Sequence, residues 1–182
     1  MVDIMTDSRQ ISMVAAFQHD FQRSRRLTEQ ALADVSDDEF FRKPGEAVNS
    51  IALIVKHMSG NLASRWSDFL TTDGDKPNRE RDQEFLITPA DSRPHLMAAW
   101  ENAWQIVTDT LASLGDEDLT RQITIRGEPH TVLQALIRSA THTAYHAGQI
   151  LYLARWLRPE SGWHTIPPGG SQQHGPGKYL RG

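Results

Sequence analysis

Residues 131–157 read TVLQALIRSATHTAYHAGQILYLARWL and form one long helical pattern that stops before Pro159. Within it, His142 and His146 lie four residues apart, so a helix places both imidazoles on one side. Ser139, Tyr145 and Gln149 fall near the two histidines on a helical wheel, while leucines and alanines occupy the far side. This segment is therefore expected to be a helix with one apolar face and one polar face that can line a pocket.

Three further patterns of the same kind cover about residues 8–33, 50–70 and 92–114. Asn49 or Ser50 suits the N-cap of the second, and Ser92 suits that of the third, with Pro94 in its first turn. The second begins with an all-apolar run, IALIV, which indicates deep burial. Between the long patterns, Ser36 with Glu39 predicts a capping box, and the segment ITIRGEPHTV is compatible with a small hairpin.

These patterns predict an all-α fold, a four-helix bundle with short extra turns. Residues 1–160 are expected to form the bundle, and residues 161–182, rich in proline and glycine, an extended tail packed on the body or on a partner subunit. In the simplest up-down-up-down order the second and fourth helices run in the same direction. His57, about seven residues into the second helix, then lies within about one turn of the height of His142.

Composition narrows the class of protein. The 182 residues have 38% hydrophobic content and a formal net charge of -4, which argues against binding to nucleic acid or to a membrane surface. The chain has no cysteine, so disulfides and a cysteine nucleophile are excluded. The N-terminal residues do not resemble a signal peptide, and no stretch is apolar enough to span a bilayer. We therefore expect a cytoplasmic protein.

The histidines allow two interpretations. A pair at a spacing of four can bind one metal ion, but the chain has eight histidines, so such a pair can also arise by chance. From pattern alone, a metal site and a pair of hydrogen-bonded core histidines are equally good explanations. His57, alone in an apolar helix, is by itself more typical of a structural histidine, although a bundle interior is a usual place for a metal site.

The polar segment at residues 71–92, TTDGDKPNRERDQEFLITPADS, is too long for an ordinary connection and is either functional or a solvated crossover. Arg65, Arg79 and Arg81 can meet an anionic substrate at the mouth of the bundle. Surface salt bridges with Asp68, Asp82 or Glu84 are the simpler explanation of these three arginines.

The stretches NSIALIVKHMSGNLASRWSDFLTTDGDKP, RERDQEF and THTAYHAGQILYLARWL together resemble the DinB-like superfamily of metal-binding bundles, in an uncharacterised bacterial branch. The most specific parts are KHMSGNLASRWSDF and HTAYHAGQI, and the match is weak over the first helix and the tail. The resemblance implies that His57, His142 and His146 are the ligands of a zinc, nickel or similar divalent ion. It also implies a non-standard helix order and a homodimer.

Three histidine ligands leave a position for water or for a small-molecule thiol, so the sequence predicts a metal-dependent small-molecule enzyme, either S-transferase-like or hydrolase-like. Characterised members of the superfamily that use low-molecular-weight thiols favour the first of these. Asn61, Arg65, Ser139, Tyr145 and Gln149 are candidates for contacts with the substrate or with the histidines. The alternatives are a non-catalytic metal-binding or dimerisation module, and structural histidines without metal.

Overall fold

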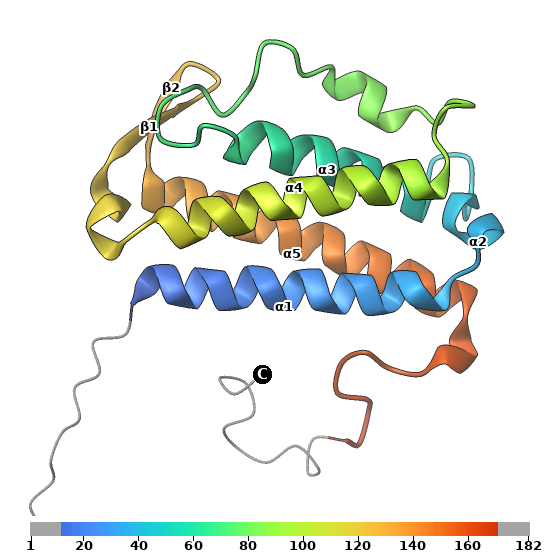
Figure 1. The fold of residues 1–182 in the computed structure, drawn as a ribbon. Coiled ribbons are helices and arrows are strands. Elements are labelled where there is room, and N and C mark those ends of the chain that lie inside the picture. Colours follow the sequence, from blue (N-terminus) through green and yellow to red (C-terminus); the bar gives the residue numbers. More distant parts are fainter. Residues whose placement is uncertain (1–11, 171–182) are drawn as a thin grey trace, which may run out of the picture.

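The computed structural model describes residues 12–170. Its body consists of α1 (Met13–Asp34), α3 (Ile51–Trp66), α4 (Arg93–Ser113) and α5 (Val132–Leu157), as Figure 1 shows. The shorter elements are α2 (Asp37–Phe41), the turns η1 (Arg81–Phe85), η2 (Asp116–Thr120) and η3 (Pro159–Ser161), and the hairpin of β1 (Gln122–Ile125) and β2 (Glu128–Thr131). The expected all-α bundle is confirmed. Within the described part, no helix has both the length and the apolarity needed to cross a membrane.

The caps predicted from the sequence begin the helices. Ser50 and Ser92 each accept a hydrogen bond from the backbone N–H three residues further on, and Thr131, which was not singled out as a cap, does the same at the start of α5. The capping box of Ser36 and Glu39 is present at α2. The end of α3 was predicted less well, since the helix stops at Trp66 rather than near Leu70. There the chain becomes extended and then turns through Asp68, which has a left-handed φ of 47°.

The helices do not follow the expected up-down-up-down order. In Figure 1 the chain leaves α3 and crosses back over residues 67–92, so that α4 runs in the same direction as α3, while α5 runs antiparallel to both. The long polar segment permits this, because α3 has 16 residues and is only about 24 Å long. The prediction that the second and fourth helices share a direction was therefore wrong.

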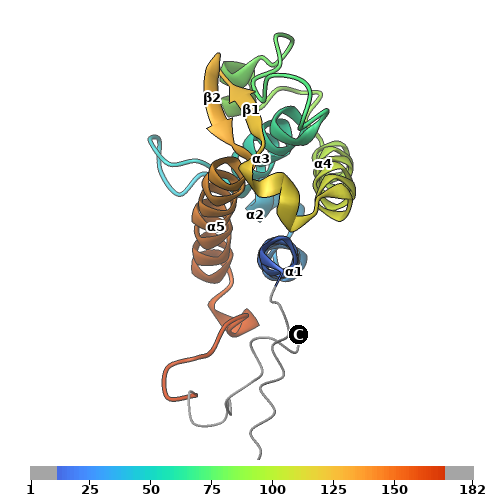
Figure 2. The same ribbon diagram turned by 90° about the vertical axis from the view of Figure 1, so that its left-hand side faces the viewer.

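The four helices form a ring in which α3 lies between α4 and α5 and is diagonally opposite α1, as the end view in Figure 2 shows. Aromatic side chains fill its centre, with Phe21 of α1 edge-on to Trp66 at a centroid distance of 5.2 Å. The apolar start of α3 is buried on all sides, as its sequence predicts. A polar side chain in the middle of α3, such as His57, is consequently enclosed by protein.

The described part of the tail contacts the bundle. The guanidinium of Arg155 lies 4.1 Å from the ring centroid of Trp163, and His164 Nε2 lies 2.7 Å from a carboxylate oxygen of Asp34. These contacts join the end of α5 to the end of α1. The remainder of the predicted tail, from residue 171 onward, lies outside the described residues.

Candidate metal centre

Three histidines from two antiparallel helices converge at the middle of the bundle. His57 comes from α3, and His142 and His146 come from α5. One ring nitrogen of each lies within 4.8 Å of those of the other two. The Nε2 atom of His142 is 3.4 Å from that of His57 and 3.2 Å from that of His146. The structure thus brings together the three residues that the sequence singled out, although the helices run in opposite directions.

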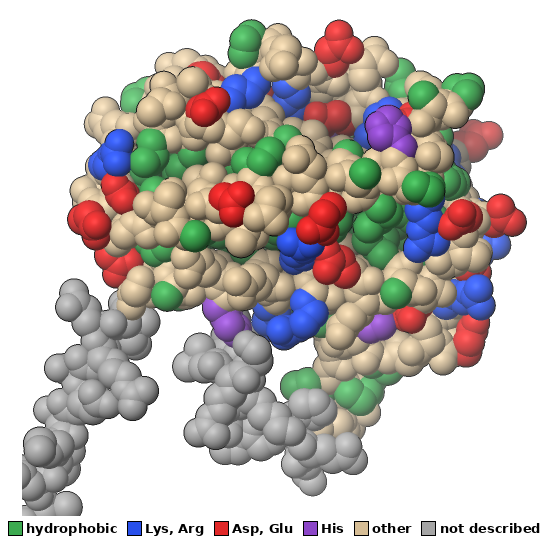
Figure 3. Space-filling model, in the orientation of Figure 1, with side chains coloured by type: hydrophobic (Ala, Val, Ile, Leu, Met, Phe, Trp, Pro, Cys, Tyr) green, Lys and Arg blue, Asp and Glu red, His purple; other side chains and the backbone are tan. Residues whose placement is uncertain are grey.

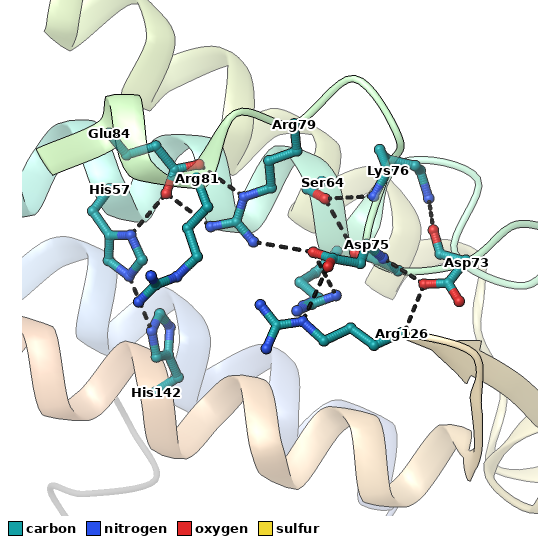
Figure 4. A network of polar contacts seen from close by, with 12 residues as sticks. His57, Ser64, Asp73, Asp75, Lys76, Arg79, Arg81, Glu84, Arg126 and His142 are labelled. Carbon is teal, nitrogen blue, oxygen red and sulfur yellow. Dashed lines mark hydrogen bonds and ion pairs between the residues drawn. The ribbon is translucent and has the colours of Figure 1, made fainter.

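The imidazole of His57 is held by an acidic side chain from the crossover. Its Nδ1–H donates to Glu84 Oε2 at 2.8 Å, and Arg79 donates from Nε and Nη2 to the two carboxylate oxygens, each at 2.8 Å (Figure 4). Burial alone would raise the pKa of Glu84, but the hydrogen bonds and charges of Arg79 and His57 outweigh it and lower that pKa. Glu84 is therefore ionised. It fixes the tautomer of His57 in which Nδ1 carries the proton and Nε2 keeps its lone pair.

Glycine at position 60 makes room for this carboxylate. Gly60 lies on α3 one turn after His57, and a Cβ added there would be 2.3 Å from Glu84 Oε1 and 2.8 Å from its Cδ. Because Arg79 and His57 hold the carboxylate from two sides, it cannot move away cheaply. Any larger residue at position 60 would displace the partner of His57.

The two histidines of α5 have a different environment. His146 Nδ1 donates to Gln149 Oε1 at 2.8 Å, and the ring of Tyr145 lies 5.1 Å from that of His146. Burial and then the charges of neighbouring groups, His146 and His57 first, lower the pKa of His142 to about 4. Burial likewise lowers the pKa of His146. Both imidazoles are therefore neutral at neutral pH, the form that binds metal ions.

A cavity of about 530 Å³ adjoins His57 and His142. Its lining includes four of the residues predicted to contact a substrate or a histidine, namely Asn61, Arg65, Ser139 and Tyr145. The fifth, Gln149, contacts His146 instead. Ser139 Oγ accepts a hydrogen bond of 3.1 Å from Trp66 Nε1, which links the start of the polar face of α5 to the end of α3.

The arginines predicted near the mouth are partly engaged in ion pairs. Arg81 lies 3.7 Å from Asp82, and Arg65 lies 3.4 Å from Asp75. Arg79 is paired with Glu84, as the salt-bridge explanation predicted, but this pair is buried and belongs to the site. Sequence reasoning assigned no role in the site to Glu84, Gly60 or Arg138. Glu84 had a usable signal, because it lies in the RERDQEF segment that resembles the metal-binding superfamily.

The fold and the site together define a class of protein, an all-helical bundle with three histidines beside a cavity. The chain belongs to a family of proteins of unknown function, DUF1572, whose model matches residues 9–170. A solved structure described as a conserved protein from Enterococcus faecalis is similar to it, with a TM-score of 0.62 and 15% sequence identity. The similarity covers 82% of this chain and 99% of that one, and it supports the fold alone. No curated protein sequence matches this chain.

Proposed function

We propose that this protein is a metal-dependent enzyme that acts on small molecules in the cytoplasm, with one zinc or nickel ion bound by His57, His142 and His146. The spacing of the Nε2 atoms carries the proposal. Zinc–nitrogen bonds of about 2.0–2.1 Å at tetrahedral angles place neighbouring ligand nitrogens about 3.3 Å apart. The two short separations here, 3.2 and 3.4 Å, match that value. The resemblance to the DinB-like superfamily supports the same ligand set.

A divalent ion on three imidazoles keeps an open position and supplies Lewis-acid chemistry, lowering the pKa of a water molecule or a small-molecule thiol. The chain supplies orientation. Glu84 and Gln149 accept the Nδ1–H groups of His57 and His146, so their Nε2 lone pairs point to one place. Because the chain has no cysteine, the sulfur of an S-transferase-like reaction comes from a low-molecular-weight thiol, and water in its place gives a hydrolase-like reaction.

Metal analysis and turnover test the proposal together. We expect about one zinc or nickel per chain in the wild-type protein and in His130→Ala, whose imidazole lies outside the cluster. We expect little metal in His146→Ala. A panel of thiols with an electrophile, and of hydrolysable esters and amides, should be turned over by the first two proteins only. Equal turnover by wild type and His146→Ala would reject the catalytic proposal.

The alternative is a non-catalytic role, in which the metal ion only stabilises the fold. The buried ion pair of Glu84 and Arg79, which holds His57, is also what such a stabilising metal site requires. This role predicts that metal raises the melting temperature while no substrate is turned over. Structural histidines without metal predict no bound metal after purification from rich medium. Elemental analysis separates this last case from the other two.

We also propose that the chain forms a homodimer through the outer side of α5. Large apolar side chains recur along one side of this helix, each at least 50% exposed: Ile137, Tyr152 and Trp156. Sedimentation analysis should show a dimer that Tyr152→Glu dissociates. Leu86→Glu, at a comparably exposed apolar residue of the crossover between α3 and α4, should leave the dimer intact. A wild-type monomer, or dissociation by both variants, would contradict this interface.

A further inference from the structure

Two rows of side chains lead from the histidines toward one end of the cavity. On α3, His57, Asn61 and Arg65 follow one another at intervals of four residues, and on α5 Arg138 precedes His142 by four. Because α3 and α5 are antiparallel, both rows lead from histidine to arginine in the same direction. The hydrogen bond between Trp66 and Ser139, the neighbours of these arginines in sequence, places Arg65 and Arg138 at the same level.

The lining of this cavity has an excess of positive charge. The described residues that line the cavity include no carboxylate and these arginines: Arg65, Arg79, Arg81, Arg126 and Arg138. The face of the molecule in Figure 3 is different, because acidic and basic side chains are interspersed there. In a chain with a net charge of -4, a cavity lined in this way is typical of an anion-binding site.

The carboxylates nearby neutralise these arginines only in part. Glu84 pairs with Arg79, and Asp82 lies 3.7 Å from Arg81. Asp75 is shared by three of the arginines, at 3.0 Å from Arg126, 3.4 Å from Arg65 and 3.6 Å from Arg79 (Figure 4). Within residues 12–170, Arg138 has neither an ion pair nor a side-chain hydrogen bond, and it is exposed to the cavity. At least one guanidinium is therefore available for a ligand.

Arg65 also has an unused donor. Its Nη1 is buried and makes no hydrogen bond, although Asp75 lies within ion-pair distance. Burial lowers the pKa of Arg65, and the charges of Arg79, Arg126 and Arg138 lower it further, while Asp75 opposes them. A buried guanidinium nitrogen without an acceptor is unfavourable, and an anionic ligand would supply the acceptor.

We propose that this cavity binds a small molecule through a carboxylate or phosphate group held by Arg65 and Arg138, with the rest of the molecule reaching toward the histidines. Arg138 and His142 are one helical turn apart, about 6 Å along the axis, so the ligand is of metabolite size. Phe69, Ile125 and Ala135 give the cavity an apolar wall, which suits an aromatic or aliphatic body. The reaction of such a substrate rests on the function proposed above, but its binding does not.

Titration of the metal-free protein tests this directly, with inorganic phosphate, benzoate and phenyl phosphate as probes and chemical shift changes as the readout. We expect saturable binding of at least one anion. Benzamide, which has the shape of benzoate without its charge, should bind at least about tenfold more weakly than benzoate. Whether benzoate or phenyl phosphate binds more tightly then identifies the preferred group as a carboxylate or a phosphate.

Variants assign the binding to the arginine. Arg138→Gln should weaken binding of the preferred anion at least about tenfold, while Arg42→Gln, an equal loss of charge on an exposed side chain away from the cavity, should not. Equal binding by wild type and Arg138→Gln, or no saturable binding of any anion, overturns this proposal even if zinc is bound. Anion binding by a protein that never takes up metal supports it and rejects the metal-dependent function instead.

Discussion

The two halves of the three-histidine site are built differently. On α3, His57 is 4% exposed. It donates a hydrogen bond to Glu84, which in turn accepts hydrogen bonds from Arg79. On α5, His142 and His146 are only partly buried, and the side-chain partner of His146 is Gln149, a neutral amide one turn along the same helix. One half depends on the crossover, and the other is built by a single helix.

The difference follows from where each helix lies. A polar group inside the apolar body of α3 is costly unless it is paired, and the crossover over residues 67–92 brings the pair to it. The polar face of α5 borders the cavity at His142, and both of its histidines are only partly buried, so they need less support from protein. We infer that the α3 half is rigid, whereas the α5 half adapts to an ion and a substrate.

Removing one ligand from each half should separate metal binding from stability. His57→Ala and His146→Ala should each lower zinc affinity more than about a hundredfold, because each removes one of three ligands. In the metal-free protein, His57→Ala should also lower the free energy of unfolding by about 3 kcal/mol, since it leaves a cavity beside a buried ion pair. His146→Ala should cost less than about 1 kcal/mol. Urea denaturation of the two metal-free variants measures this, and equal losses would contradict the contrast.

The hydrogen-bond partners should differ in the same way. Glu84→Gln keeps the shape but removes the charge that His57 and Arg79 both contact, so zinc affinity should fall about 10–100-fold. Gln149→Ala removes a neutral acceptor at a partly exposed position and should cost less than tenfold. Competition with a chromophoric chelator gives both values. A larger effect of Gln149→Ala would reverse the assignment of the rigid half.

Local patterns in the sequence predicted the helices and most of their caps well, because apolar spacing and residues such as Ser50 and Ser92 act over a few positions. The three histidines were also found, by spacing on α5 and by resemblance for His57. The up-down-up-down order was wrong, because nothing local fixes the path of a polar segment of this length, whereas the non-standard order that the resemblance implies agrees with the structure. The convergence survived the error because His57 and His142 both lie near the middle of their helices, where reversing one helix changes the height little.

Glu84 and Gly60 illustrate what sequence reasoning missed. Glu84 is 27 residues from His57 and looked like one of several exposed acidic residues in a polar loop. Its burial depends on the crossover lying against α3, which is a long-range property. Gly60 was not singled out at all, because its role depends on where the carboxylate of Glu84 lies in three dimensions.

Two glycines provide a matched test of that role. Alanine normally stabilises a helix relative to glycine by up to about 1 kcal/mol. Gly148→Ala on α5, made in the Tyr152→Glu background because Gly148 lies on the proposed dimer face, should show this gain and unchanged zinc affinity, since no atom of the chain lies within 4 Å of the added methyl. Gly60→Ala should instead lower zinc affinity about tenfold and destabilise the fold by about 1–3 kcal/mol, since the methyl overlaps Glu84. Thermal melts and chelator competition measure both, and a Gly60→Ala protein with normal affinity would show that the Glu84 contact is dispensable.

The α5 half should also impose a pH dependence on the metal-free protein. The pKa of His142 is lowered from 6.5 to about 4, chiefly by burial and then by the charges of His146 and His57. Between these values the unfolded chain binds more protons than the folded one, so stability rises with pH over that window and is lost as pH falls through it. We expect a loss on the order of 2 kcal/mol between pH 6.5 and 4, and a smaller one in His142→Gln. Urea denaturation across this range measures how the free energy of unfolding changes with pH. Equal slopes in the wild-type protein and in His142→Gln would mean that His142 is already exposed to solvent in the folded state.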